Sequence, residues 1–385
     1  DEHSVVLWTR VTSPDPDRTS HVRWELACDE GFTNVTGAGR FRTGPARDHT
    51  VKVLAGGLEP GSRYFYRFEL DGVFSETGRT RTLPVGHLER LGIAIASCSN
   101  YPFGYFNAYE AIAADPEVDL VVHLGDYIYE YGAAGWGSAV GAGIDRLHEP
   151  EGEIVSLSDY RIRHAQYKSD AGSRAMHAAH PLIAIWDDHE SANNPWIGGA
   201  ENHQASEEGD WATRRNASLV AYFEWMPVRD PLPGHSRSNY WRCYQFGDLA
   251  SLITLETRHT GRAKQIEYGD YLTRLETARD AEWFANEILG APGRDMLASE
   301  NSQFVSERLR QSVKAGQPWR LIANQIPMAR VHVPNLSGTS LVPEIVDPND
   351  PVATALAKMA RIGELDLPIY LDTWDGYPDA RERFY

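Results

Sequence analysis

Cysteine is scarce in this sequence, whose 385 residues include three: Cys28, Cys98 and Cys243. Three thiols are too few for a disulfide framework and leave at least one free, which excludes the small disulfide-rich class of secreted domain. Long apolar runs are also missing, because no stretch approaches the ~20 residues that a membrane-spanning helix needs. The chain has no internal repeat and no low-complexity tract, so we expect ordinary globular domains.

Positive charge is in short supply as well. Lys and Arg together number 37 against 54 Asp and Glu, which gives a formal net charge of −17. This balance opposes non-specific binding to nucleic acid and to anionic lipid surfaces. A phosphate-ester substrate would therefore need local cations in its binding site, and bound metal ions would supply them.

The pattern of hydrophobicity changes near residue 87. Before it, apolar and polar residues alternate with period two, as at Val22, Trp24 and Leu26, and turn clusters separate the runs. We therefore expect an all-β sandwich domain over residues 1–87. After it, strand patterns alternate with helical ones, which indicates an α/β domain over residues 88–385.

One strand of the α/β part ends in an acidic residue. The apolar run Leu120–Leu124 is short and rich in branched side chains, which is typical of a strand buried on both faces. Gly125 allows a tight turn, and Asp126 then lies at the carboxyl end of the strand, where open α/β sheets bind their ligands. Asp126 is our first candidate for a metal ligand, with a turn or helix cap as the alternative.

Two further strands end in the same way. Residues 181–186 lead into Asp187, Asp188, His189 and Glu190. Adjacent carboxylates repel one another and are tolerated most easily where a cation compensates their charge. Residues 91–96 lead into Cys98, whose thiol would join the same edge if the three strands are neighbours.

Taken together, these motifs resemble a known family. Ser97-Cys98, the run from Gly125 to Glu130 and the run from Trp186 to Glu190 resemble the PhoD-like alkaline phosphatases, a branch of the calcineurin-like metallophosphoesterases. The resemblance continues through Tyr160–Arg163, Leu255–Arg258 and Trp374–Pro378, and so covers nearly the whole chain. It implies a four-layer α/β metallophosphoesterase-type sandwich flanked by helices, behind an N-terminal fibronectin type III-like sandwich.

The resemblance also implies a set of metal ligands. Asp126 would bridge two metal ions, and Fe³⁺ would be held by Cys98 and by Tyr129, since thiolate and phenolate ligands suit a trivalent iron. Asp188 matches the metal-binding asparagine of the wider superfamily, and Ca²⁺ would occupy the adjoining oxygen-rich positions. Asp187 and Glu190 would hold the ligands in place or lie at the start of a helix after the strand, rather than touch a metal.

Two catalytic residues complete the expected site. His189 would stabilise the transition state or protonate the leaving group, and Arg258 would clamp phosphate oxygens. The sequence leaves other roles open: a small buried apolar residue for Cys98, a core aromatic for Tyr129, a helix cap or surface group for His189 and a surface ion pair for Arg258. Four more residues lie near the expected rim without an assigned role: His123, Asn193, Asn194 and Gln325.

The last motifs of the superfamily are missing. Metallophosphoesterases of this type finish their site with Gly-Asp-x-His or Gly-His-x-His, whereas none of the Gly-Asp pairs here is followed by such a histidine. We expect the catalytic domain to be truncated at its C-terminus. The alternative is that His332, Asp372 or Asp375 supplies the missing ligand.

The remaining pattern predicts the other elements of the α/β domain. Residues 132–155 are glycine-rich and aperiodic, which indicates a lid or rim loop. Strands are expected at 249–255 and 319–323. Helical patterns cover 158–178, 209–225, 279–289 and 302–315, the last with Ser302 as its cap and Gly316 as its stop.

The sequence thus predicts a metal-dependent phosphatase of PhoD-like type. It would hydrolyse small-molecule phosphodiesters and phosphomonoesters with a metal-bridging hydroxide as nucleophile, in the periplasm or outside the cell, without a membrane span or specific nucleic-acid binding. The chain begins at Asp1 within an expected strand, so the lack of a leader says nothing about export. Two alternatives stay open: a phospholipase D-like esterase, and a non-catalytic relative that binds phosphate or polyanions.

Overall fold

The computed structural model describes residues 1–13, 15–340 and 350–385. The chain folds into two compact units. The first comprises Asp1–Pro195, Gly199–Glu256 and Gln303–Gln325, and the second comprises Trp196–Gly198, Thr257–Ser302 and Ile326–Tyr385. The predicted domain boundary after residue 87 falls inside the first unit and stays a prediction.

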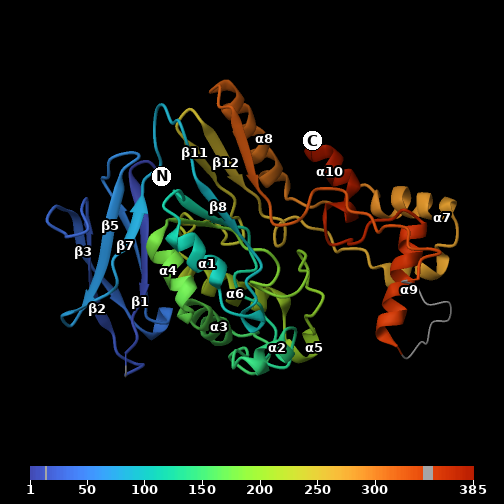
Figure 1. Cartoon of the computed structure of the whole chain (residues 1–385), viewed down its shortest axis with the longest axis horizontal. Coiled ribbons are helices and arrows are strands. Elements are labelled where there is room, and N and C mark those ends of the chain that lie inside the picture. The colour runs from blue at the N-terminus through green and yellow to red at the C-terminus, as the bar shows by residue number, and fades with distance from the viewer. Residues whose placement is uncertain (14, 341–349) are drawn as a thin grey trace. The chain divides into compact units, whose positions relative to one another are not determined.

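The first unit begins with antiparallel strands, drawn in blue in Figure 1. These are β1 (Ser4–Arg10), β2 (Ser20–Ala27), β3 (Val35–Thr43), β4 (Thr50–Gly56), β5 (Arg63–Leu70), β6 (Val73–Phe74) and β7 (Gly78–Arg81). β1 pairs with β4, while β3, β2, β5 and β6 form a second sheet in that order, with β7 also on β5. Inward-facing side chains such as Val22, Leu26, Val53 and Phe68 share one core. The predicted all-β N-terminal part is confirmed.

Two sheets follow in the same unit. The first contains β8 (Ile93–Ala96), β9 (Leu120–His123) and β10 (Leu182–Ala184), all parallel, with β9 in the middle. The second contains β11 (Cys243–Phe246), β12 (Ala250–Thr254) and β13 (Trp319–Ala323), with β12 antiparallel to β11 and parallel to β13.

One core joins these two sheets. It includes Val122 and Ile183 from the first sheet, Leu252 and Ala323 from the second, and the buried indole of Trp186. Branched side chains on both faces of a strand require cover on both sides, which the facing sheet and the surrounding helices provide. The predicted α/β fold behind an all-β N-terminal part is therefore confirmed.

Helices surround the two sheets. They are α1 (Asn107–Ala114), α2 (Ser138–Gly143), α3 (Leu157–Ser169), α4 (Ala171–Ala179), α5 (Ala205–Glu208), α6 (Trp211–Trp225) and α8 (Ser299–Lys314), with a short 3₁₀ turn η2 (Tyr101–Phe103). α1 packs against α4, and α3 packs against α6 (Figure 1). Among the described residues no helix is both long and apolar enough to cross a membrane.

Two helix predictions in this part of the chain need correction. The helix expected over 158–178 is two helices, because Asp170 is extended and its carboxylate accepts from the backbone N–H groups of Gly172 and Ser173, which starts α4. The helix expected from Ser302 already begins at Ser299, so Ser302 lies inside it. Its predicted stop is confirmed, since Gly316 adopts a left-handed φ of 71°. The aperiodic glycine-rich segment contains the short helix α2.

The second unit has its own core. Its elements are η3 (Tyr268–Asp270), η4 (Leu272–Arg274), α7 (Ala278–Trp283), the π-helix η5 (Phe284–Leu289), α9 (Pro351–Glu364), η6 (Trp374–Gly376) and α10 (Pro378–Phe384). Tyr268, Leu275, Phe284 and Leu371 are buried together in this core. The helix expected over 279–289 is thus an α-helix followed by a π-helical turn. The helices α9 and α10 are not among the predicted elements.

Candidate metal centre

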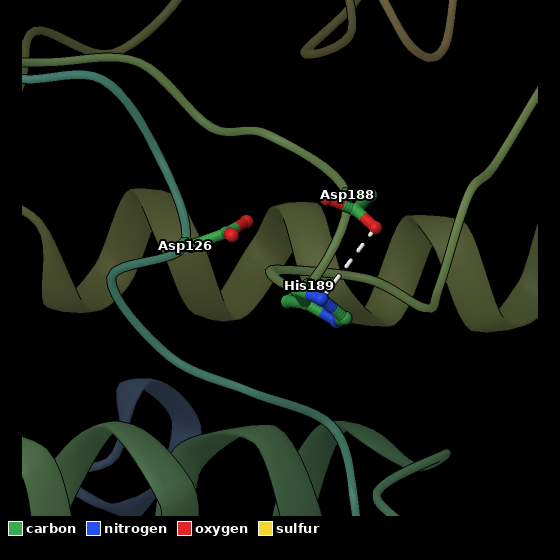
Figure 2. Close-up of side chains that lie close together, drawn as sticks. All are labelled: Asp126, Asp188 and His189. Atoms are coloured by element: carbon green, nitrogen blue, oxygen red, sulfur yellow. Dashed lines mark ion pairs between the residues drawn. The ribbon is translucent and has the colours of Figure 1, made fainter. Parts of the chain in front are cut away.

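Three neighbouring strand ends supply the side chains of the site. β8, β9 and β10 are parallel, so the residues that follow them meet at one edge of the sheet. Asp126 follows β9, while Asp188 and His189 follow β10. Ligand atoms of these three buried residues lie within 4.8 Å of one another, and Figure 2 shows their side chains directed toward a common space from two loops.

Two residues of the site have unusual backbone conformations. Cys98 and Asp126 both lie in the left-handed region, with φ of 59° and 54°. Hydrogen bonds between the loops stabilise them: the N–H of Cys98 donates to Gly125 O (3.2 Å), and the N–H of Ser99 donates to Asp126 O (2.9 Å). Non-glycine residues persist in this region where surrounding structure imposes it, commonly at functional sites.

Gly125 brings the β9 and β10 loops together. Its φ of 98° lies in the region that favours glycine. A Cβ atom at this position would also lie 2.3 Å from the backbone nitrogen of Asp187. Glycine is therefore required here for the turn and for the close approach of the second loop.

Glu190 joins the same two loops by hydrogen bonds. Its buried carboxylate accepts from the backbone N–H groups of Asp126 (3.1 Å), Tyr127 (2.7 Å) and Asp187 (2.8 Å). Burial raises the pKa of Glu190 to about 7, although these donors favour the ionised form. Glu190 thus fixes the backbone that presents Asp126, in agreement with the supporting role predicted from the sequence.

The carboxylate of Asp126 is the centre of the cluster. Its Oδ2 accepts a hydrogen bond from the Tyr129 hydroxyl (3.0 Å) and lies 3.5 Å from Sγ of Cys98. Its Oδ1 is buried and has no hydrogen-bond partner within the described ranges. A buried carboxylate oxygen left in this state is costly unless a cation or another donor satisfies it.

The electrostatics of the cluster fit a bound cation. Burial, followed by the neighbouring Asp126, raises the pKa of the Cys98 thiol to about 11, and the same two causes raise the pKa of Tyr129. Burial and then Asp188 raise the pKa of Asp126 well above its usual value. A multivalent cation would reverse these shifts by stabilising the thiolate, phenolate and carboxylate forms together.

His189 is held by a buried glutamate. Its Nδ1 lies 2.7 Å from Oε2 of Glu130, and its Nε2 lies 3.6 Å from Oδ2 of Asp188. Burial opposes the charged imidazolium, but Asp188 and Glu130 outweigh it and raise the pKa of His189 well above its usual value. The ring also stacks on Tyr129, with centroids 4.2 Å apart.

Glu130 is a further residue of the site, for which the sequence predicts no role. Besides His189, its fully buried carboxylate accepts from the backbone N–H of Asn193 and from Nδ2 of Asn202, both at 2.7 Å. No sequence pattern points to Asn202. A signal for Glu130 was present, because it closes the motif that begins at Gly125, but its partner lies 59 residues away in the chain.

The structure brings together Cys98, Asp126, Tyr129, Asp188 and His189. Cys98 as a whole residue is exposed, although its thiol is partly buried against Asp126, so the alternative of a small buried apolar residue is wrong. Tyr129 is buried, but its hydroxyl is bonded to Asp126. Arg258 belongs to the second unit, where its buried guanidinium pairs with Asp372 at 3.0 Å.

Of the remaining predicted rim residues, Asn194 contacts the cluster directly and the others contact its neighbours or the core. The N–H of Asn194 donates to Oδ2 of Asp188 (3.0 Å), and Asn193 bonds Glu130. Gln325 donates from Nε2 to the carbonyl oxygens of Trp186 and Leu255. His123 is buried and bonds Tyr109 at 2.6 Å.

Each of the three residues considered for the late ligand has a partner in the second unit. Asp372 pairs with Arg258 and Arg262, Asp375 pairs with Arg381, and His332 lies 2.8 Å from a carboxylate oxygen of Asp366. The ion pairs engage the carboxylates of Asp372 and Asp375, whereas the contact at Nδ1 of His332 is compatible with metal binding through its other ring nitrogen.

Comparison with known proteins gives consistent matches. Residues 1–84 match the family model "PhoD-like phosphatase, N-terminal domain", and residues 93–385 match "PhoD-like phosphatase". The chain is 36% identical over 391 aligned residues to alkaline phosphatase D of Bacillus subtilis (strain 168), covering 99% of this chain and 58% of that protein. The solved structure titled "Structure of PhoD" aligns with TM-score 0.75 and 35% identity, covering 99% of this chain and 66% of the other.

The alignment with the Bacillus subtilis protein includes 99% of this chain, but the chain spans only 58% of that protein's length. The family assignment does not depend on the uncovered part, because the two family models together match nearly all of the present chain. The motifs that carry the candidate metal ligands lie inside the matched residues. The chain belongs to the PhoD-like phosphatase family.

Proposed function

We propose that this chain carries the active site of a metal-dependent phosphoester hydrolase that acts on phosphodiesters and phosphomonoesters. One observation carries the proposal: Oδ2 of the buried Asp126 carboxylate contacts the Cys98 thiol and the Tyr129 phenol, while Oδ1 of the same carboxylate has no hydrogen-bond partner in the described chain. Membership in the PhoD-like phosphatase family supports the same reaction.

The donor set supports two kinds of cation. The thiol of Cys98 and the phenol of Tyr129 suit Fe³⁺, with Asp126 between them, while the oxygen atoms of Asp126 and Asp188 suit Ca²⁺. Bound cations would neutralise charge on the phosphoryl oxygens and lower the pKa of the attacking water. The proposal therefore includes the identity of the two metal ions, Fe³⁺ and Ca²⁺.

The protein's own residues would control the proton of the leaving group. Nε2 of His189 faces the cluster, whereas Nδ1 is engaged by Glu130. The glutamate therefore fixes the orientation of the ring and favours its protonated form, as a general acid requires. Protonating the leaving oxygen makes its departure easier as the bond to phosphorus breaks.

Arg258 is retained as a proposed phosphate clamp. Its guanidinium pairs with Asp372, so binding a substrate oxygen would require it to share or exchange that partner. Substitution by lysine tests the clamp, because lysine keeps the charge and loses the bidentate geometry. A higher KM with unchanged kcat would support this role, and unchanged kinetics would contradict it.

Turnover experiments separate this proposal from its rivals. Purified protein is assayed with bis(4-nitrophenyl) phosphate and 4-nitrophenyl phosphate before chelation, after chelation and after return of Fe³⁺ and Ca²⁺. Hydrolysis that disappears and returns supports the proposal. Binding of phosphate without any turnover would favour a non-catalytic relative, and choline release from phosphatidylcholine would favour a phospholipase D-like esterase.

Location outside the cytoplasm is the last part of the proposal. We propose that the enzyme works in the periplasm or the extracellular space, as the family resemblance implies. Fractionation of producing cells, with a cytoplasmic marker enzyme followed in parallel, tests it. Recovery with the cytoplasmic marker would contradict it.

A further inference from the structure

Large aromatic side chains are exposed beside the metal centre. Trp136 lies in the glycine-rich segment after β9, and 56% of its surface is exposed; Phe103 in η2 is 46% exposed. Their rings are in contact, with centroids 4.9 Å apart in an edge-to-face arrangement. A cluster of exposed aromatic surface is more informative than a single exposed apolar residue, since it marks a binding surface.

Contacts between aromatic rings connect this exposed surface to His189, the proposed general acid. The Trp136 ring lies 5.9 Å from that of Tyr129 and 6.4 Å from that of Tyr131. Both tyrosines in turn contact the ring of His189, at 4.2 Å and 5.4 Å. The exposed indole is therefore one ring away from the histidine that faces the cluster.

Close backbone packing fixes the segment that carries Trp136. A Cβ atom on Gly137 would lie 3.1 Å from the Phe103 ring, and one on Gly135 would lie 2.8 Å from Cβ of Tyr131. The carbonyl oxygen of Trp136 also accepts from Nδ2 of Asn100 at 3.5 Å. The glycines thus allow the segment to pack tightly, and the indole is held in place beside the site.

We propose that Trp136 is a specificity-determining residue that stacks on an aromatic ester group of the substrate. The inference rests on the proposed phosphoester hydrolysis and narrows its substrate class to esters with a flat aromatic or heteroaromatic group. A phosphoryl group at the Asp126–Asp188 cluster would place its ester group next to the surrounding rings. An indole face favours a flat π-system over a saturated ring of the same size, because stacking adds to apolar burial.

Phosphonates test this binding without any turnover. Metal-loaded full chain is titrated with phenylphosphonate, cyclohexylphosphonate and methylphosphonate, and binding is followed by calorimetry. The wild-type chain should bind phenylphosphonate most tightly. Trp136→Ala should weaken phenylphosphonate roughly 2- to 12-fold, the range for one aromatic pair, and leave methylphosphonate unchanged, whereas Trp136→Phe should keep the preference.

Trp319→Ala is the matched control, because Trp319 at the start of β13 is 61% exposed and lies outside this ring cluster. Equal affinity for the phenyl and cyclohexyl ligands would overturn the aromatic class, and equal effects of the two alanine variants would overturn the role of Trp136. Different results would contradict the proposed hydrolysis and the proposed stacking by Trp136. Phenyl preference without hydrolysis of any ester contradicts the hydrolase, while hydrolysis without phenyl preference contradicts the stacking role.

Discussion

Oε2 of Glu130 lies 2.7 Å from Nδ1 of His189, and both side chains are buried. The second oxygen of the same carboxylate accepts from Asn193 and Asn202. Glu130 is therefore held on both sides and can impose one orientation on the imidazole ring. This pairing leads to the first prediction.

Glu130→Gln should lower kcat/KM for a chromogenic diester about 10- to 100-fold, the typical loss when a group that orients a functional side chain is changed. The amide keeps the shape but loses the charge that stabilises a protonated His189. Metal content and melting temperature should change little. Glu117→Gln, an exposed change, serves as the control, and equal kcat/KM values in the two variants would refute the role.

Asp126→Asn should reduce activity at least tenfold more than Asp187→Asn. Asp126 contacts both Cys98 and Tyr129 and carries the unpartnered oxygen, whereas Asp187 contributes its backbone N–H to Glu190. Steady-state kinetics with metal in excess measure the difference. Similar losses in the two variants would mean that the central carboxylate has been wrongly assigned.

Cys98→Ser should weaken and shift the visible absorption band and lower the iron content of the purified protein. Charge transfer from thiolate or phenolate to Fe³⁺ gives such a band, and serine replaces the soft ligand with a hard one. Absorption spectra and elemental analysis are the measurements, with Cys28→Ser as control because that thiol is exposed in the N-terminal sandwich. A colourless wild-type protein with stoichiometric iron would contradict the assignment.

Glu190→Ala should weaken metal binding about 10- to 100-fold and lower the melting temperature. The change leaves backbone N–H groups of Asp126, Tyr127 and Asp187 without their acceptor, at about 1–3 kcal/mol for each that water does not reach. Glu190→Gln should fall between alanine and wild type, since one acceptor oxygen remains. Metal titrations that give the same affinity for all three proteins would exclude this role.

Lys168→Met should flatten the pH dependence of stability between about pH 7 and pH 10. Burial lowers the pKa of Lys168 from 10.5 to about 7 in the folded chain. In that window the unfolded chain binds the extra proton, so this lysine makes stability rise with pH. Melting temperatures at several pH values should show a smaller rise in the variant, with exposed Lys264→Met as control; parallel curves would contradict it.

The strand ends that carry the site, and one helix end, could be predicted because they depend on the pattern of residues that are close in sequence. Asp126 and Asp188 each follow a run of apolar residues that ends at a strand terminus, and parallel strands bring their termini together. The stop at Gly316 likewise follows from a local conformation. Cys98 carried the weakest local signal, and its place beside Asp126 was expected from the family resemblance.

The missed features depend on contacts that sequence patterns do not reveal. The break between α3 and α4 follows from Asp170, whose capping role competes with a helical pattern that continues through it. The pairing of Glu130 with His189 spans 59 residues and exists because two loops fold against each other. α9 and α10 lie in a unit whose core comes from distant segments, so their local pattern was not decisive.

The close approach at Gly125 has a consequence for how this protein tolerates mutation. The nearest atoms to a Cβ there are backbone and Cβ atoms of Trp186 and Asp187, which cannot rotate away as the end of a flexible side chain could. Any replacement would push apart the two loops that carry Asp126 and Asp188. In a saturation screen for activity, position 125 should therefore be as intolerant as a metal ligand, although glycine offers no side chain to the chemistry.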